Sequence, residues 1–416
     1  MKIAIFNKGI PYDGRTPFVQ PLGGSESGVV HMARELGRLG HDLTVYCNCP
    51  EPGLYDGVNY KHHRSIFDDY AYANWDVVVT FRSFEPLLIG RIAPRMIFWT
   101  GDDCDQQGQE NLTHPSIRNN IDFVFCVSEW HKQRFVKAFG LPADKIVATR
   151  NGFVPELVPS GVPKCWTQGV YTSTPFRGLE FLLTKIFPEL RARIPGMSLD
   201  VFSSMKVYQW TDDQDNSLNG HIYRAAVQPG VTMHGGVPQP DLLQAMAPAG
   251  FLLYPNTFEE TSCIAAIESQ ASGAVVVTSA RAGLNETVED QKTGICLKGD
   301  PASNAYQAEF VRTVCALLAN PARLEELSAN ARRRAFGRYT WNVVAREWVA
   351  LFETMTAKPV HRRYDGPIFQ LERARAYQRS GNAVAARRAL AGIEGLPFLK
   401  TGIDEIQNAF NVEVKV

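Results

Sequence analysis

The chain has 416 residues, of which 45% are hydrophobic and 21% charged; this composition is typical of globular proteins, and the length predicts two domains. Lysine plus arginine and aspartate plus glutamate number 43 each, which argues against a protein that binds nucleic acid or membranes through its overall charge. No apolar run approaches the ~20 residues of a membrane helix, and no signal peptide is evident. We therefore expect a cytoplasmic protein that at most touches the inner face of a membrane.

A strand, a pair of glycines, a helix and a second strand come first. The apolar runs 2–6 and 42–46 predict strands, and the apolar stripe between residues 28 and 39 predicts a helix. Gly23 and Gly24 stand before this helix. Such a loop can bring backbone N–H groups and a helix N-terminus up to a phosphate. Glycines that merely turn the chain are the simpler alternative for one such unit.

The ends of this helix are predicted from its polar and glycine residues. Ser25 or Ser27 can accept an N–H of the first turn and is the expected N-cap. Gly40 stands where a left-handed residue ends a helix.

The same alternation continues to about residue 160. Further strands are expected at 76–80, 95–99, 123–127 and 146–149, with a helix over 129–139. Short apolar strands that alternate with helices predict a parallel sheet covered on both faces. We therefore expect an α/β domain over residues 1–160. The Pro- and Gly-rich segment 151–164 is the expected linker.

A second α/β domain is expected over residues 165–340. Its strands are predicted at 168–172, 198–203, 229–233, 250–254 and 274–278, and its helices at 178–194, 240–247, 262–271 and 304–319. A helix over 341–356 follows, with an apolar stripe of Trp341, Val344, Trp348 and Phe352.

The segment 358–416 is predicted to be a helical tail. Helical patterns at 367–379 and 383–393 are separated by Gly381, a C-cap signal, and Asn382, an N-cap signal. Because a single hairpin cannot bury its apolar face alone, we expect it to pack on the body of the protein. A disordered tail is the alternative.

Two glutamates eight residues apart mark the candidate site. Glu260 stands where a loop meets a helix and Glu268 stands within that helix, two turns further on. The N–H groups of Glu260, Thr261 and Ser262 can bind phosphates, and a buried carboxylate at Glu268 can accept the hydroxyls of a ribose. A solvated helix face is the alternative, but "CIAAIESQASG" predicts burial of Glu268, and a buried carboxylate needs partners.

At this point the chain resembles glycosyltransferase family 4. The resemblance covers residues 1 to about 356, and its pieces are "GGSES", "LGRLGHDLTVY", "VSEWHKQRF", "NGFVPELV", "FRGLEFLL", "HGGVPQPDLLQAMA", "FEETSCIAAIESQASGAVVV" and "AGLNETVEDQKTG". It implies the GT-B fold, in which two Rossmann-like domains with parallel sheets face each other. It also implies that the helix over 341–357 crosses back to the N-terminal domain.

The resemblance further implies transfer of a sugar from a nucleotide-sugar donor with retention of configuration. It assigns Glu260 to the hydroxyls of the transferred sugar, Glu268 to the ribose and Arg177 to the diphosphate. A loop that includes His234, Gly235 and Val237 then flanks the base. Gly23 and Gly24 face the donor from the N-terminal domain, which is taken as the acceptor side.

Two positions depart from the family pattern. Members often carry a histidine after the fourth strand, where this chain has Gly101 followed by Asp102. Asp102 thus joins Glu260 and Arg177 as a candidate catalytic residue. Many members also have an arginine shortly before the position of Arg177, where this chain offers Tyr171, Thr172 and Ser173. Because of these two differences, a weakened or inactive enzyme remains an alternative interpretation.

No metal and no other cofactor is expected. Asp103-Cys104-Asp105 matches a D-x-D metal motif, but in this fold we interpret it as a loop, because the diphosphate already has Arg177. The acidic stretch 212–220 resembles a calcium loop without its closing glutamate, and we expect a solvated loop. The eight cysteines are scattered, which is typical of reduced core residues.

The leading hypothesis is a metal-independent, retaining glycosyltransferase. Its expected partners are a nucleotide-sugar donor and a glycan, lipid-linked or small-molecule acceptor, with no nucleic acid. One alternative is a catalytically silent protein that binds sugar nucleotides. A sugar-nucleotide epimerase of similar fold is a second alternative, disfavoured by the two-glutamate motif.

Overall fold

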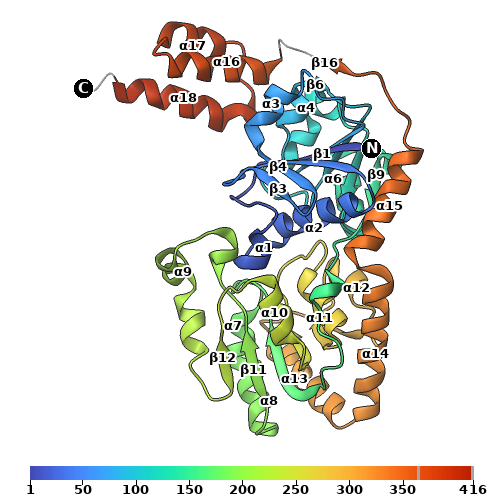
Figure 1. The fold of residues 1–416 in the computed structure, drawn as a ribbon. Coiled ribbons are helices and arrows are strands. Elements are labelled where there is room, and N and C mark those ends of the chain that lie inside the picture. Colours follow the sequence, from blue (N-terminus) through green and yellow to red (C-terminus); the bar gives the residue numbers. More distant parts are fainter. Residues whose placement is uncertain (363–365, 414–416) are drawn as a thin grey trace.

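The computed structural model describes residues 1–362 and 366–413, and Figure 1 shows two halves, each built on one sheet. The first sheet has the order β3-β4-β2-β1-β5-β7-β8-β9, and its pairs are parallel except β3 with β4. Its strands are β1 (Lys2–Asn7), β2 (Asp42–Cys47), β3 (Gly53–Tyr55), β4 (Val58–His62), β5 (Val77–Phe81), β7 (Arg95–Trp99), β8 (Phe123–Cys126) and β9 (Ile146–Ala148). All six strands predicted in this half are confirmed; β3 and β4 were not expected.

Helices cover both faces of this sheet. The longest are α2 (Gly24–Arg38) and α6 (Glu129–Phe139), and the short ones are α1 (Thr16–Val19), α3 (Ile66–Asp69), α4 (Glu85–Leu88) and α5 (Pro115–Arg118). The predicted N-cap of α2 is wrong. The helix begins earlier, with Gly23 as N-cap, so Ser25 and Ser27 lie inside its first turn. Gly40 has the expected left-handed backbone, with φ of +87°.

The second half contains a parallel sheet of the order β12-β11-β10-β13-β14-β15. Its strands are β10 (Cys165–Tyr171), β11 (Ser198–Val201), β12 (Val231–Met233), β13 (Ala249–Tyr254), β14 (Val275–Ser279) and β15 (Gly294–Leu297). The five predicted strands are confirmed, and β15 is an addition.

The helices of the second half depart from expectation at two places. They are α7 (Leu179–Phe181), a π-helical turn (Leu182–Ile186), α8 (Phe187–Arg193), α9 (Asp212–Ala225), α10 (Gln239–Met246), α11 (Ile264–Ser272), α12 (Leu284–Thr287), α13 (Asn304–Leu318) and α14 (Pro321–Arg338). The acidic stretch 212–220 is not a loop, because Thr211 and Gln214 form a capping box that starts α9 there. The long helix α14 was also not expected.

Helix α15 (Trp341–Thr354) passes from the second half to the first (Figure 1). It packs against α2. The four residues of its predicted stripe are all buried, in one apolar cluster with residues of β1, β2 and α2. The indole N–H of Trp348 donates to Thr149 Oγ1 at 2.6 Å. This helix therefore completes the core of the first half.

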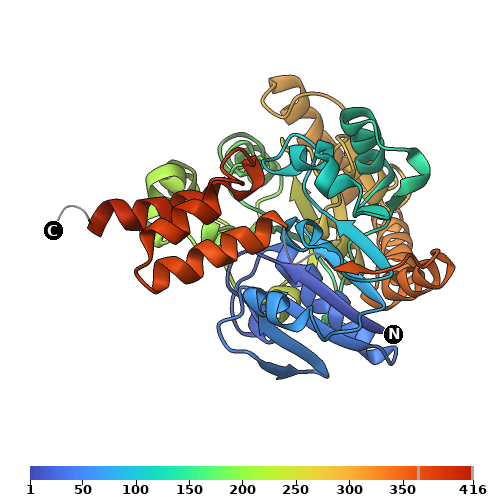
Figure 2. The ribbon, with the colours of Figure 1, turned by 90° about the horizontal axis from the view of Figure 1, so that it is seen from above.

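The tail packs on the first half as three helices, α16 (Pro367–Arg379), α17 (Ala383–Leu390) and α18 (Lys400–Glu413). Figure 2 shows them extending beyond the sheet. Apolar side chains of the tail join a core cluster of the first half: Ile368, Leu371, Leu390, Ile393, Ile403 and Ile406. A two-stranded pair of β6 (Gly90–Arg91) and β16 (His361–Arg362) adds a second attachment. Packing on the body and the N-cap Asn382 are confirmed. The C-cap of α16 is Ser380, and Gly381 follows it with a left-handed backbone, φ of +71°. Helix α18 is an addition, and parts 363–365 and 414–416 of the predicted tail lie outside the described residues.

Candidate active site

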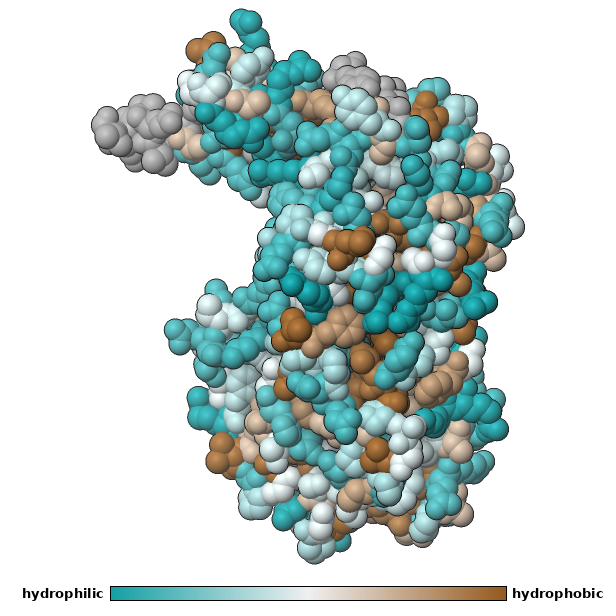
Figure 3. Space-filling model, in the orientation of Figure 1, coloured by the Kyte–Doolittle hydropathy of each residue, from teal (hydrophilic) through white to brown (hydrophobic). Residues whose placement is uncertain are grey.

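A cavity of about 470 Å³ lies between the two halves and is lined by both. Figure 3 shows the surface hollowed between the halves on the side where α9 lies. From the second half the lining comes from loops after β10 and β13, at the carboxyl ends of parallel strands, and from the beginning of α11. From the first half it comes from the start of α2 and the loops after β5 and β7. Carboxyl ends of parallel strands are where open α/β sheets bind their ligands.

The two glycines before α2 line this cavity and touch the opposite half. A Cβ on Gly24 would lie 2.8 Å from Cδ1 of Ile264, the first residue of α11. A Cβ on Gly23 would lie 3.4 Å from the carbonyl oxygen of Val207. The glycines therefore let the first half approach the second half itself, in addition to facing the cavity.

Arg177 and Glu260 form an ion pair in the cavity wall, in which Glu260 is buried and Arg177 is partly exposed. Arg177 Nη1 lies 2.9 Å from Glu260 Oε1, which also accepts the hydroxyl of Tyr254 at 2.6 Å. The guanidinium stacks over the ring of Phe258 at 4.4 Å. Gly178 allows this geometry, because its φ is +102° and a Cβ there would lie 2.0 Å from the carbonyl oxygen of Pro255.

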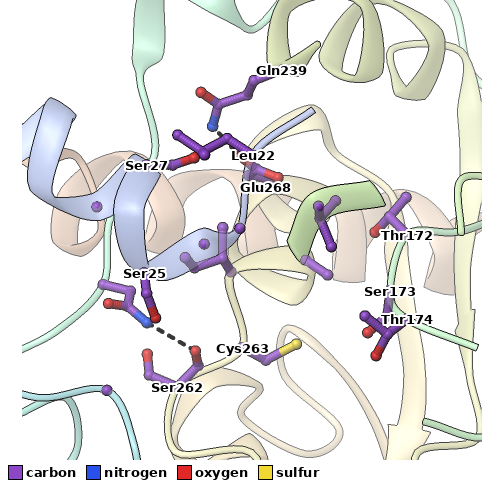
Figure 4. A pocket seen from close by; sticks show the side chains of 18 of the residues that line it. Leu22, Ser25, Ser27, Thr172, Ser173, Thr174, Gln239, Ser262, Cys263 and Glu268 are labelled. Carbon is purple, nitrogen blue, oxygen red and sulfur yellow. Dashed lines mark hydrogen bonds between the residues drawn. The ribbon is translucent and has the colours of Figure 1, made fainter. Parts of the chain in front are cut away.

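The same wall holds polar groups without partners. Arg177 Nε, Thr172 Oγ1 and Thr174 Oγ1 are buried and have no hydrogen-bond partner among the described residues. All three residues line the cavity, and Figure 4 shows Thr172 and Thr174 on the same flank of it. Buried polar groups are normally satisfied, so unsatisfied ones at a cavity indicate a ligand or water.

The loop before α11 was expected to offer three backbone N–H groups. That of Glu260 instead donates to the carbonyl oxygen of Phe258 at 3.0 Å, so this part of the expectation is wrong. The N–H groups of Thr261 and Ser262 have no backbone partner among the described residues, and both residues line the cavity. Because α11 begins only at Ile264, Glu260 lies in the loop and not on the face of the helix that carries Glu268.

Glu268 lies inside α11, 3% exposed, and reaches the same cavity. Gln239 Nε2 donates to Glu268 Oε1 at 2.6 Å (Figure 4), and Gln239 Oε1 lies 2.7 Å from Nε2 of His31 on α2. Burial raises the pKa of Glu268 to about 7, against the opposing hydrogen bond from Gln239. Burial lowers the pKa of His31 to about 4. Neutral His31 therefore donates from Nε2 to the amide oxygen, which links the two halves.

The loop predicted to flank the base contributes to the cavity wall. Gly235 and Val237 line it, whereas His234 does not. His234 stacks on Phe202, with ring centroids 4.4 Å apart, and its Nε2 lies 2.8 Å from Asp200 Oδ1. Since Phe202 itself lines the cavity, His234 supports the wall from behind.

Gly101 and Asp102 line the cavity from the first half. The carbonyl oxygen of Gly101 accepts the hydroxyl of Thr261 at 2.6 Å, so this loop joins the two halves. Asp102 Oδ2 accepts from Arg82 Nε at 2.6 Å. Arg82 also lies 3.5 Å from Oε1 of the buried Glu26, and has a left-handed backbone with φ of +55°.

The D-x-D motif lies in an ion pair. Asp103 is buried and accepts from Arg134, with Oδ2 2.8 Å from Nη2. Asp105 lies 3.6 Å from the same nitrogen. Within residues 1–362 and 366–413, no group of three or more histidine, cysteine, aspartate or glutamate side chains could hold a metal ion. All eight cysteines are free, as expected, but only five are buried: Cys104 and Cys315 are partly exposed and Cys165 is exposed.

A second contact between the halves involves a helix N-terminus. The carboxylate of Glu286 on α12 accepts from the N–H groups of Glu129 and Trp130, in the first turn of α6. It lies beside a second cavity of about 260 Å³. The positive end of the α6 dipole favours a carboxylate there.

Residues 162–320 match the family model described as glycosyl transferases group 1. Among curated proteins, the lipopolysaccharide 1,2-N-acetylglucosaminetransferase of Salmonella typhimurium is 25% identical over 255 residues, which cover 57% of this chain and 64% of that one. The D-inositol 3-phosphate glycosyltransferase of Segniliparus rotundus is 29% identical over 171 residues, covering 41% and 36%. These alignments span less than two thirds of either relative.

Solved structures match over a larger part of the chain. A sucrose-phosphate synthase from Thermosynechococcus elongatus covers 85% of this chain with a TM-score of 0.63 and 17% identity, over 98% of its own length. The Anabaena protein HepE in complex with UDP and glucose covers 85% with a TM-score of 0.63 and 15% identity, over its full length. The chain has the GT-B fold. The likeness to group 1 glycosyltransferases rests on residues 162–320 and on the partial alignments with curated proteins. Among the described residues, no helix combines the length and hydrophobicity needed to cross a membrane.

Three cavity residues were not predicted from the sequence. Gln239, His31 and Arg82 carry contacts between segments far apart in the chain, which no local pattern reveals. Gln239 stands in "HGGVPQPDLL", where only the preceding loop was singled out. Glu26 was quoted within "GGSES" but was given no role.

Proposed function

We propose that this GT-B chain transfers a sugar from a nucleoside-diphosphate sugar to the hydroxyl group of an acceptor. The second half holds the donor, and the first half faces the acceptor across the cavity. The observation that carries the proposal is Arg177, a partly buried cation that lines a cavity between the halves and whose buried Nε has no hydrogen-bond partner among the described residues. Thr261 and Ser262, whose N–H groups have no backbone partner in the described part of the chain, line that cavity too.

These donors suit a diphosphate. Departure of the nucleoside diphosphate builds negative charge on phosphate oxygens, and a preorganised guanidinium with backbone N–H groups stabilises that charge. The hydroxyls of Thr172 and Thr174 offer further hydrogen bonds from the same wall. Arg177 therefore acts on the leaving group.

The two glutamates take different roles. Glu260, held by Arg177 and Tyr254, contacts hydroxyls of the transferred sugar as positive charge develops at its anomeric carbon. Glu268 accepts the ribose hydroxyls once it is ionised, with Gln239 holding its other side. His234, Gly235 and Val237 lie around the base, His234 from behind Phe202.

The reaction is proposed to retain configuration and to need no metal. The acceptor oxygen bonds to the anomeric carbon on the face that the diphosphate leaves, the bond from carbon to phosphate oxygen breaks, and the acceptor proton passes to that phosphate oxygen. The ion pair of Asp103 with Arg134 is consistent with a site in which Arg177 takes the place of a metal ion. The protein is proposed to act in the cytoplasm on a glycan, lipid-linked or small-molecule acceptor, with at most peripheral membrane contact.

A two-stage experiment tests this function. A panel of nucleoside diphosphates is first screened by thermal shift, since a ligand that binds the folded state raises the melting temperature. The corresponding nucleotide sugars are then assayed for release of nucleoside diphosphate. Binding followed by slow release supports a transferase, whereas no binding to any member would refute the proposal.

A catalytically silent binder of sugar nucleotides is the second candidate. The observation that favours it is Gly101, which puts no side chain into the cavity and uses its carbonyl oxygen to hold Thr261. Tight donor binding without turnover, with every acceptor class offered, would favour this candidate.

A further inference from the structure

Gln239 lies between the carboxylate that is proposed to hold the ribose and the opposite half of the protein. It is the first residue of α10 and lines the cavity. Its Nε2 donates to Glu268 Oε1 at 2.6 Å, as Figure 4 shows, and its Oε1 lies 2.7 Å from Nε2 of His31 on α2. Glu268 and His31 line the cavity as well. One side-chain amide therefore connects α11 of the second half with α2 of the first half.

The two neighbours of this amide fix its orientation. Ionised Glu268 can only accept hydrogen bonds, so the amide nitrogen must face it and the amide oxygen must face His31. That oxygen needs a donor, and His31 supplies one from Nε2. Burial lowers the pKa of His31 to about 4, with Arg34 adding to this effect and Glu156 opposing it. His31 is therefore a neutral donor near pH 7.

Two prolines restrict the backbone that carries the amide. Pro238 is the N-cap of α10, with φ of −56°, and Pro240 is the second residue of the helix. Each ring fixes the φ of its own residue, and Pro240 also limits the conformations of the residue before it. The side chain of Gln239 thus starts from a backbone with little freedom, which favours one placement of its amide.

Gln239 is the polar group that acts on the charge of Glu268. Burial raises the pKa of Glu268 to about 7, and the hydrogen bond from Gln239 opposes this rise. In the described part of the chain no cation pairs with Glu268, and no hydrogen bond reaches its Oε2. This oxygen is left for ribose hydroxyls, which donate to the ionised form and therefore favour it. The ribose contact thus depends on a charge that Gln239 stabilises.

We propose that Gln239 is a positioning residue that makes nucleotide affinity depend on a side chain of the opposite half. Its amide stabilises ionised Glu268, and His31 holds the amide in the orientation that does so. His31 therefore strengthens the binding of the ribose through Gln239. This inference rests on the proposed function and names two residues that tune the affinity of its donor site.

Loss of the bond between Gln239 and His31 should leave the two halves in contact. The hydroxyl of Thr261 donates to the carbonyl oxygen of Gly101 at 2.6 Å, and Glu286 accepts from the N–H of Glu129 at 2.8 Å. Both bonds join the halves without either of the two residues. A change of affinity in their variants therefore reports on Glu268 and not on separation of the halves.

Nucleotide binding measured over a range of pH tests this inference. UDP, GDP and ADP are screened by thermal shift, and the one with the largest shift is titrated by calorimetry at pH 6, 7, 8 and 9. Gln239→Met removes the amide and keeps the length of the side chain. Because the pKa of Glu268 then rises further, affinity should fall at least about fivefold at pH 7 but less than about threefold at pH 9, where Glu268 is again ionised.

His31→Phe tests the dependence on the opposite half. It keeps an aromatic ring and removes the donor to Gln239. Its loss of affinity should be smaller than that of Gln239→Met and should also shrink as the pH rises. In the double variant His31→Phe with Gln239→Met, the histidine substitution should cost no further affinity, because it acts through the amide.

Two variants are matched controls. Gln244→Met makes the same substitution at an exposed position of α10. Gln209→Met breaks a different bond between the halves, from Gln209 Nε2 to the carbonyl oxygen of Pro11 at 2.8 Å. Both should bind the nucleotide as the wild type does at every pH. Titration of the nucleotide's own phosphate is common to all of these proteins, so it cancels in the comparison.

Several results would overturn the inference. One is a loss of affinity in Gln239→Met that is absent or equal at every pH. Others are wild-type affinity in His31→Phe, or losses that simply add in the double variant. If Gln209→Met weakened binding as much as His31→Phe, contact between the halves in general would explain the effect. A wild type that binds none of the three nucleoside diphosphates would instead count against the proposed function.

Discussion

The buried carboxylate of Glu268 predicts that the protein without ligand loses stability as the pH rises. Its pKa is raised from 4.5 to about 7 by burial, and its side chain is almost fully enclosed. Below pH 4.5 the group is protonated in the folded and the unfolded chain, so it contributes no difference between them. Above pH 7 it is ionised in both, and the folded state then bears the full cost of a buried charge.

The size of this cost follows from the shift in pKa. It amounts to about 3 kcal/mol of unfolding free energy at high pH, and about 2 kcal/mol of it develops between pH 5.5 and 8. Glu268→Gln keeps the shape of the protonated side chain and removes the titration. The variant is therefore expected to gain about 2 kcal/mol relative to the wild type over that range.

Urea denaturation of both proteins at pH 5.5, 6.5, 7.25 and 8 measures this difference. Glu180→Gln is the matched control, because Glu180 is an exposed residue of the same half. The control should follow the wild type at every pH. Equal pH slopes for Glu268→Gln and the wild type, within about 0.5 kcal/mol, would refute the reasoning that the buried carboxylate is ionised at a cost.

Three further outcomes are expected. Glu268→Ala should weaken binding of the nucleoside diphosphate. Glu260→Ala should mainly lower kcat, because Glu260 contacts the transferred sugar, where charge develops in the transition state. Equal losses of affinity in both variants would contradict the assignment. Release of nucleoside diphosphate should be unchanged by EDTA, and loss of activity with rescue by Mn²⁺ would give Asp103 and Asp105 a metal role. Trp348→Ala should lower the unfolding free energy by about 3–5 kcal/mol, as for other buried aromatic residues; a change below about 1 kcal/mol in thermal or urea unfolding would show that α15 is not part of the core of the first half.

Strands and most helices could be predicted because their signals are local. Runs such as "DVVVT" and "RMIFW" lie within one element and are buried in the sheet, so their composition reports their place directly. The short strand β3 has only three residues, one of which is glycine, and it offers no such run. The capping box of α9 was masked by acidic residues that resemble a calcium loop.

From local pattern alone, the site was predictable only where its residues are neighbours in sequence; Arg177, Gly23 and Gly24, which also line the cavity, were assigned through the family resemblance. Glu260 and Glu268 share one loop and helix, and both line the cavity. The bond between His31 and Gln239 joins positions 208 residues apart. The pair of Arg134 with Asp103 depends on the packing of α6 beside the loop that follows β7. Such contacts are decided by tertiary structure, so the sequence pattern alone could not assign partners.

The placement of α15 and the tail has a consequence for synthesis on the ribosome. The core of the first half includes Trp348 and Phe352 of α15 and Leu371, Leu390 and Ile406 of the tail. All of these are translated after the second half, whose strands and helices lie in one continuous stretch from Cys165 to Arg338. The half that emerges first must therefore wait for its last helices, while the half that emerges later can fold as soon as it is complete. The core of the half that emerges first is thus completed only after that of the half that emerges later.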